Sequence, residues 1–335
     1  MDGSWDIGAG SYNGAIVAAS QGQRLAARQT SASRTRDLVV LALQSSGTCR
    51  LCGRWLLSSD VSKIPEQDLL WASVTAVLRN NARIQGTGER AIVFAHGYGC
   101  DQNMWRYVEP AFRSGFRTVL YDQVGAGGSD LRAYDTEKYS RLDGYVDDLI
   151  ELCGELGLHD AIFVGHSVSA MIGVLASLKA PGLFGKLILV GPSPRYIDDG
   201  EYVGGFSADQ IQELLDFLGE NQMGWAAAIA PAIMGNSDRP ELGQELVDSF
   251  CRMDPEIAKQ FAHVTFTSDN RDDLPKVDVP TVILQCSDDI IAPTCVGEYV
   301  HRHIAGSTLV QLAATGHCPN LSAPGEVIDV IRAHL

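Results

Sequence analysis

The sequence lacks any long apolar run, since no stretch reaches the roughly 18 residues that a membrane-spanning helix needs. It is also poor in positive charge, with 26 lysines and arginines against 41 aspartates and glutamates and a net charge of −15. A surface with this excess of acid repels nucleic acid and anionic lipid. We therefore expect neither a nucleic acid nor a membrane as a partner.

Cysteine is sparse too. The eight cysteines are scattered over 335 residues, whereas small secreted domains held by disulfides are far denser in cysteine. This usage favours a reducing compartment, the cytoplasm. Cys49 and Cys52 form one C-x-x-C pair, but neither a second pair nor histidines at ligand spacing follow it. We predict no zinc site there, no other metal, and no organic cofactor.

Residues 1–72 differ in composition from the rest of the chain. They are rich in Ser, Ala, Gly and Arg, and their 7 basic and 6 acidic residues leave the net acidity to the remainder. The arginines within residues 1–40 resemble an organelle-targeting peptide, but Asp2 and Asp6 argue against one. A disordered tail and a start codon assigned too far upstream are the alternatives. We predict an N-terminal extension over 1–72 and one folded domain over 73–335.

From about residue 74 onward, short apolar runs alternate with segments of helical periodicity. Runs such as "RAIVFAHG" and "DAIFVGHS" stop at glycine or polar residues, as parallel strands buried on both faces do. Residues 142–156 carry apolar side chains at helical spacing. This alternation predicts an α/β fold with a mostly parallel, doubly wound sheet. The alternating segment "SVTAVLRNNARIQG" predicts an edge strand over 73–86.

A long stretch over about 194–272 contains no strand-like run. It begins a helix with a capping box, Ser207 and Gln210, and Pro240 and Pro255 lie where two later helices would start. We predict a four-helix insertion after the sixth strand of the fold, placed over the carboxyl edge of the sheet.

The segment "IFVGHSVSAM" nearly matches the G-x-S-x-G signature of a serine nucleophile. It has Gly165 and Ser167, but Ser169 replaces the last glycine. An apolar strand precedes Ser167 and a helix follows it, which is the strand-to-helix turn that lifts a nucleophile above the sheet. The alternative is a serine that only caps a helix.

A serine nucleophile needs a base and a carboxylate that orients the base. In this strand-to-helix setting the chain order is serine, acid, histidine. Asp288 and Asp289 end one strand, and His317 lies in a glycine-led loop after the last strand. Both places are carboxyl ends of strands, where an open α/β sheet builds its site. The residues therefore predict a triad of Ser167, His317 and one of the two aspartates.

Such a triad also needs backbone N–H groups that stabilise a developing oxyanion. The segment "HGYG" at 96–99 follows the first buried strand, and Val168 opens the helix after Ser167. We predict an oxyanion hole from the amides of Tyr98 and Val168, with His96 in a structural role.

At these residues the chain resembles the α/β-hydrolase superfamily. Within it, the chain is similar to the RsbQ-like group of bacterial stress regulators and to its plant relatives, the karrikin and strigolactone receptors. The resemblance covers about residues 76–335. The segments that carry it are "HGYGCDQNMW", "YDQVGAGGSDLRAYD", "GHSVSAMIGVLAS", "VGPSPRYIDD", "EYVGGF", "LQCSDDIIAP" and "GHCPNLS".

The resemblance implies several features of the site. The family accepts serine in place of the last elbow glycine, and the register of its acid against Gln285 and Pro293 corresponds to Asp289. It also implies a lid of four helices over a closed apolar pocket. The positions that match the family's pocket are Tyr98, Tyr196, Phe206 and Phe266.

Two functions follow from the residues and the resemblance together. The first is a serine hydrolase of a small hydrophobic ester or lactone, with an acyl-enzyme intermediate. The second is a signalling protein that binds a small ligand, hydrolyses it slowly or incidentally, and acts with a phosphatase-type protein partner, as the resemblance implies. An intact triad does not distinguish the two, because signalling members of the group keep theirs.

Overall fold

The computed structural model describes residues 50–51, 54–55 and 75–335. The chain divides into two compact units, residues 1–73 and 74–335. In the first unit, β1 (Arg50–Leu51) pairs antiparallel with β2 (Arg54–Trp55). The predictions for the Cys49–Cys52 pair and for most of the extension lie outside the described residues. No helix in the described part of the chain is both long and apolar enough to cross a membrane.

The second unit is built on one seven-stranded sheet with the order β3-β5-β4-β6-β7-β8-β9. All neighbouring strands are parallel except β3 and β5, which are antiparallel. Every residue of the central strand β6 is buried, which explains its continuous apolar run. The predicted α/β sheet is confirmed. The strands are β3 (Arg83–Gln85), β4 (Ala91–Ala95), β5 (Arg117–Tyr121), β6 (Ala161–His166), β7 (Phe184–Val190), β8 (Thr281–Gln285) and β9 (Thr308–Gln311).

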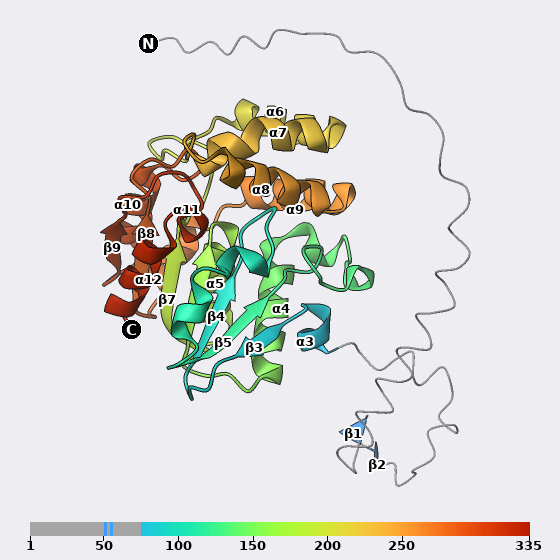
Figure 1. Cartoon of the computed structure of the whole chain (residues 1–335), viewed down its shortest axis with the longest axis vertical. Coiled ribbons are helices and arrows are strands. Elements are labelled where there is room, and N and C mark those ends of the chain that lie inside the picture. The colour runs from blue at the N-terminus through green and yellow to red at the C-terminus, as the bar shows by residue number, and fades with distance from the viewer. Residues whose placement is uncertain (1–49, 52–53, 56–74) are drawn as a thin grey trace, which may run out of the picture. The chain divides into compact units, whose positions relative to one another are not determined.

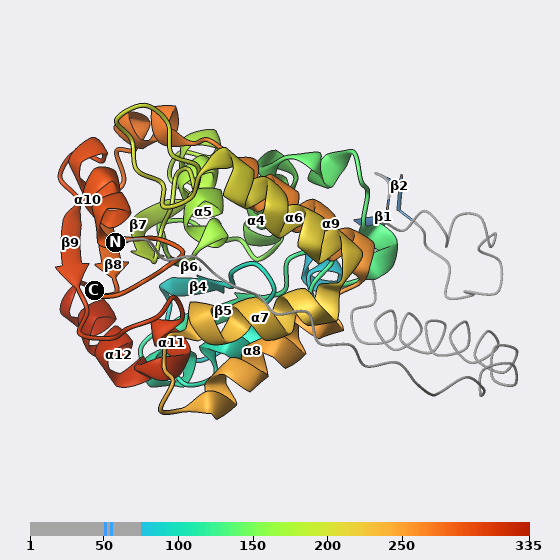
Figure 2. The same cartoon turned by 90° about the horizontal axis from the view of Figure 1, so that it is seen from above.

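Helices cover both faces of the sheet. Figure 2 shows α4 (Leu142–Glu155) and α5 (Val168–Lys179) on one side and α12 (Pro324–Ala333) on the other. The edge strand β9 is preceded by α10 (Thr294–His303), and the short helix α11 (Pro319–Ser322) precedes α12. This layering buries both faces of the parallel strands and leaves their carboxyl ends for the site.

The predicted edge strand over 73–86 is only partly correct. Its second half forms β3, but its first half is the short helix α3 (Ala76–Arg79). The Thr75 side chain caps this helix, and the Glu155 carboxylate of α4 accepts hydrogen bonds from the N–H groups of Ala76 and Val77 at 2.9 and 3.1 Å. A local sequence pattern cannot indicate capping by a residue of a distant helix. Here this capping outweighs the weak alternation of apolar and polar residues.

Four helices follow β7, as predicted: α6 (Ala208–Glu220), α7 (Gln222–Met234), α8 (Pro240–Arg252) and α9 (Pro255–Thr267). Figure 1 shows them stacked beyond one end of the sheet. The predicted strand count was wrong. Strand β7 is the fifth strand of the sheet in chain order, not the sixth, because only β3 precedes β4 among the described strands of this sheet.

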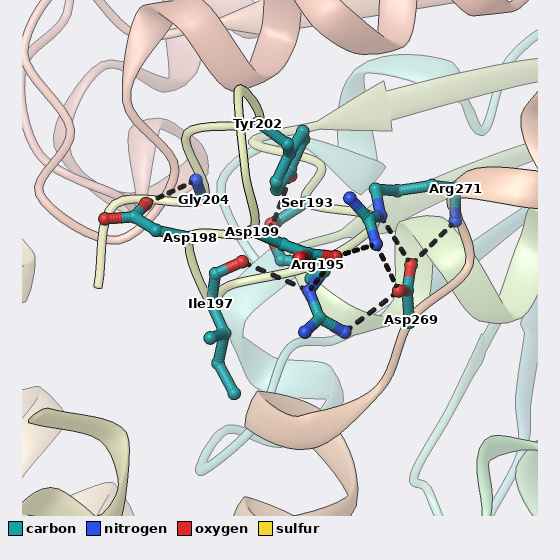
Figure 3. A network of polar contacts seen from close by, with 9 residues as sticks. All are labelled: Ser193, Arg195, Ile197, Asp198, Asp199, Tyr202, Gly204, Asp269 and Arg271. Atoms are coloured by element: carbon teal, nitrogen blue, oxygen red, sulfur yellow. Dashed lines mark hydrogen bonds and ion pairs between the residues drawn. The ribbon is translucent and has the colours of Figure 1, made fainter. Parts of the chain in front are cut away.

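The two ends of this insertion are joined by a polar network, which we call the neck network (Figure 3). It consists of Arg195 and Asp199 from the segment before α6, and Asp269 and Arg271 from the segment after α9. Arg195 contacts Asp269 at 2.9 Å, and Arg271 contacts Asp199 at 2.7 Å. Single exposed ion pairs contribute little, but a shared network fixes geometry. The two chain segments that connect the insertion to the sheet are therefore joined to each other by ion pairs.

Candidate active site

Ser167 lies in the sharp turn between β6 and α5. Its φ of 56° and ψ of −124° are rare for a residue other than glycine, and such strain concentrates at functional sites. A Cβ on Gly165 would lie 2.6 Å from the Ser169 carbonyl oxygen, so the turn requires glycine there. Ser169 itself fits, because its hydroxyl donates to the His96 carbonyl oxygen.

The structure brings Ser167, His317 and Asp289 together. The Ser167 hydroxyl lies 2.7 Å from Nε2 of His317, and Nδ1 of the same ring lies 2.7 Å from Oδ2 of Asp289. All three side chains are buried. Asp288 is exposed and contributes its backbone, since its carbonyl accepts the Gly316 N–H at 2.7 Å. The residue in contact with the histidine is therefore Asp289.

Asp289 is held as a carboxylate. Burial by itself would raise its pKa, but the neighbouring His317, the hydrogen bond to that ring and two backbone N–H groups outweigh burial and hold the pKa of Asp289 below its usual value. The two amides belong to Ile291 and Ala292, which donate to Oδ1 at 2.9 and 3.1 Å. One carboxylate oxygen is thus fixed by the backbone, and the other is directed at the imidazole.

His166 supports the loop of His317, a role that no motif in the sequence indicated. Its Nε2 lies 2.7 Å from the His317 carbonyl oxygen, which can only accept, so Nε2 carries the proton. Burial, together with the nearby His317, lowers the pKa of His166 to about 3, so the ring is neutral. Its position directly before Ser167 was the only signal in the sequence.

The amides of Tyr98 and Val168 lie near Ser167: Val168 follows it directly, and a Cβ on Gly97, next to Tyr98, would lie 3.2 Å from the Ser167 Cβ. Val168 is the first residue of α5, where backbone N–H groups have no partner inside the helix. Tyr98 lies between Gly97 and Gly99, just after β4. Within residues 75–335 neither amide has a hydrogen-bond partner. Two backbone donors are therefore free near the serine, which is the arrangement an oxyanion hole requires.

A small apolar cavity of about 30 Å³ lies over Ser167 and His317. Three of the four predicted pocket residues, Tyr98, Tyr196 and Phe266, line it. Phe206 does not line it; this residue lies in the segment before α6, where its N–H donates to the Tyr196 carbonyl at 3.2 Å. The lining residues that were not predicted, apart from the triad, are Cys100, His166, Ile233, Leu246, Phe250, Thr265, Ile291 and Cys318.

Much of this lining comes from the four-helix insertion. Helix α8 contributes Leu246 and Phe250, and α9 contributes Thr265 and Phe266. The Tyr196 ring packs against that of Phe266, with ring centroids 5.1 Å apart, and its hydroxyl lies 3.5 Å from the Ser167 hydroxyl. Burial raises the pKa of Tyr196 to about 12. The cavity thus lies between the sheet and the insertion, with the Tyr196 hydroxyl and the His317 ring next to Ser167.

Comparison with known proteins agrees with this architecture. The family model "Alpha/beta hydrolase family" matches residues 92–330. The strigolactone esterase D14 of Arabidopsis thaliana is 40% identical over 256 residues, which cover 76% of this chain and 96% of that protein. The karrikin insensitive 2 receptor CA of Petunia hybrida is 39% identical over 257 residues, which cover 76% of this chain and 95% of the receptor.

A solved structure of a hydrolase from Oleispira antarctica matches with a TM-score of 0.76 and 39% identity, covering 77% of this chain and 95% of that one. The sheet, the strand-to-helix turn at Ser167, the family model and these relatives lead to one assignment. The chain belongs to the α/β-hydrolase family.

Proposed function

We propose that this hydrolase is a serine esterase that cleaves a small hydrophobic ester or lactone. One observation carries the proposal: Ser167, His317 and Asp289 form a continuous chain of two 2.7 Å contacts at the base of an apolar cavity. A hydroxyl held against an oriented imidazole is the arrangement of an activated nucleophile.

In the proposed mechanism the Ser167 hydroxyl attacks the carbonyl carbon while His317 accepts its proton at Nε2. Asp289 keeps the imidazole in the productive orientation and stabilises the imidazolium. The amides of Tyr98 and Val168 stabilise the oxyanion. His317 then returns the proton to the leaving alkoxide, which stays attached to the acyl chain when the substrate is a lactone. Water, deprotonated by His317, hydrolyses the acyl-enzyme and restores Ser167.

The small volume of the cavity supports a narrow substrate range. Its volume of about 30 Å³ is far below the roughly 300–1,000 Å³ of small-molecule pockets, so the insertion must shift before a substrate can enter. We propose that the four-helix insertion is a lid that admits short esters and excludes long acyl chains and peptides. The name of the strigolactone esterase relative is consistent with a lactone among the substrates.

The test uses a fluorophosphonate probe and p-nitrophenyl acetate. Wild type should be labelled and should cleave the acetate, whereas Ser167→Ala should lose labelling, and Ser167→Ala and His317→Ala should each lose nearly all activity above background. Labelling that persists in Ser167→Ala would place the nucleophile elsewhere and refute the proposal. Circular dichroism melting of both variants serves as the control for folding.

A second candidate function is a small-ligand receptor with slow or incidental hydrolysis. The observation that favours it is the 39% identity to a protein named as a karrikin insensitive 2 receptor. In this function the protein belongs to the RsbQ-like group and acts on a protein partner, by resemblance a phosphatase-type regulator. Tight binding of a small ligand by a wild type that resists the fluorophosphonate probe would favour the receptor over the esterase.

A further inference from the structure

One buried hydroxyl in the cavity has no role in the proposed triad. Thr265, on α9, is 1% exposed and lines the cavity, and its Oγ1 has no hydrogen-bond partner among the described residues. Buried hydroxyls are almost always paired, since an unpaired one loses its hydration without compensation. This hydroxyl is therefore an unsatisfied polar group at the wall of the site.

The same helix offers a contrast. Thr267, two residues later and exposed, donates to the His263 carbonyl at 2.7 Å, which is the usual local bond of a helical threonine. Thr265 makes no such bond to its own helix. Its hydroxyl is thus left without a partner at the wall of the cavity, although a helical threonine commonly bonds to its own backbone.

Most other polar groups of the lining have contacts, and the Tyr196 hydroxyl lies 3.5 Å from that of Ser167. Ser167 contacts His317, and the Tyr98 hydroxyl donates to the Ala258 carbonyl at 3.0 Å. Nδ1 of His166 also lacks a partner, but it faces Gly97, where even a Cβ would lie 2.5 Å away, so a ligand cannot reach it there. Thr265 is left as a lining residue whose buried hydroxyl has no partner among the described residues.

The lack of charged side chains in the lining restricts the chemical class of the ligand. None of the residues that line the cavity is Asp, Glu, Lys or Arg. A carboxylate or phosphate on the ligand would be buried without a counter-ion, which is strongly unfavourable. The ligand is therefore neutral, and any polar atom that it carries beyond the scissile group must find a neutral partner.

We infer that the Thr265 hydroxyl is a specificity subsite that donates a hydrogen bond to a second oxygen atom, ether or carbonyl, of a neutral ester or lactone. The inference rests on the proposed function, because it places the scissile carbonyl at Ser167. It deepens that function by naming the substrate class: small neutral esters with an additional acceptor oxygen, in preference to all-carbon esters of the same shape.

The test compares substrates that differ by one oxygen. p-Nitrophenyl methoxyacetate is paired with p-nitrophenyl butanoate, which tests the acyl side, and 4-acetylphenyl acetate with 4-isopropylphenyl acetate, which tests the leaving-group side. For each pair we divide the kcat/KM of the ester with the additional oxygen by the kcat/KM of its all-carbon counterpart. Differences in intrinsic reactivity cancel when this ratio is compared between protein variants.

Thr265→Val keeps the shape of the side chain and removes the hydroxyl. It should lower the ratio by about threefold to tenfold for at least one pair, as loss of one hydrogen bond does. Thr265→Ser should restore the ratio, and Thr267→Val, the matched control on the same helix, should leave it unchanged. Because no protein partner is lost, Thr265→Val should melt at the same temperature as wild type or higher.

The binding affinities of the same four esters are also measured with Ser167→Ala and with Ser167→Ala/Thr265→Val. Neither variant has the nucleophile, so the esters are not hydrolysed during the titration. One outcome is that wild type hydrolyses the esters while Thr265→Val changes neither the kcat/KM ratio nor the difference in binding affinity of either pair. In that case the subsite is refuted and the proposed function stands. If wild type neither hydrolyses them nor reacts with the fluorophosphonate, yet Thr265→Val weakens binding of the oxygen-bearing ester selectively, the esterase proposal fails and the subsite stands.

Discussion

At the residue scale, Asp288 and Asp289 form a matched pair of neighbours with different environments. Asp289 contacts His317 at 2.7 Å and is buried, whereas the Asp288 side chain is exposed. Asp289→Asn should lower kcat by about 10⁴-fold, because an amide cannot hold the imidazole in the productive tautomer. Asp288→Asn should change it by less than about twofold, since surface changes of this kind are nearly neutral. Steady-state kinetics on p-nitrophenyl acetate measures both, and the reverse order would overturn the assignment.

His166 predicts a pH dependence of stability. Its folded pKa of about 3 lies below the ordinary value of 6.5, so the unfolded chain binds one more proton between these values. The free energy of unfolding should therefore fall as the pH falls below 6.5. Between pH 7 and pH 5 the titration of His166 should lower the free energy of unfolding by about 2 kcal/mol.

Urea denaturation of wild type and His166→Gln at the two pH values checks this. The Gln side chain keeps a donor for the His317 carbonyl but does not titrate. The variant should lose about 2 kcal/mol less than wild type on acidification. Equal losses in both proteins would show that His166 does not carry the effect.

The sequence predicts the residues whose chemistry is tied to strand ends. Ser167 and His317 could be placed because each follows an apolar run. The choice of Asp289 over Asp288 needed the resemblance, since both end the same strand. Phe206 was misplaced and Thr265 was missed for one physical reason: which face of a segment meets the cavity depends on tertiary packing, which a local pattern does not encode.

At the element scale, the insertion contacts the loop that carries one of the proposed oxyanion donors. The Tyr98 hydroxyl donates to the Ala258 carbonyl of α9 at 3.0 Å, and the Ser249 hydroxyl of α8 donates to the Gly99 carbonyl at 2.7 Å. A Cβ on Gly99, which has a φ of 73°, would lie 1.8 Å from the Phe250 ring. Two helices of the insertion thus hold the loop by side chain and by backbone.

Tyr98→Phe should therefore lower kcat by about threefold to tenfold with little change in KM, because a misplaced amide weakens transition-state stabilisation rather than substrate binding. The matched control is Tyr202→Phe, which removes a hydroxyl that donates to the Arg195 carbonyl at 2.6 Å in the neck network. Both variants should lose about 1 kcal/mol of stability. A similar kcat loss in both would attribute the effect to destabilisation instead.

Elements were predictable in proportion to their length and burial. Strands such as β6, buried along its whole length, and helices with their own caps, such as α6 with Ser207 and Gln210, follow from local sequence. The short helix α3 does not, because its first N–H groups are capped by Glu155 of α4, which is far away in sequence. Elements fixed by distant partners exceed what periodicity can indicate.

At the scale of the whole molecule, we predict that residues 1–72 are dispensable for the fold and the site. All seven strands of the sheet, the four-helix insertion and the triad lie within 75–335. The N-terminal helix of this part, α3, is capped by Thr75 and Glu155, so its start needs nothing upstream. A truncated protein that begins at Ser73 should melt cooperatively within about 2 °C of the full chain. It should also keep the kcat/KM of the full chain for p-nitrophenyl acetate. Differential scanning calorimetry and the esterase assay on both proteins decide the matter. Loss of soluble protein or of activity on truncation would show that the extension contributes to the hydrolase fold.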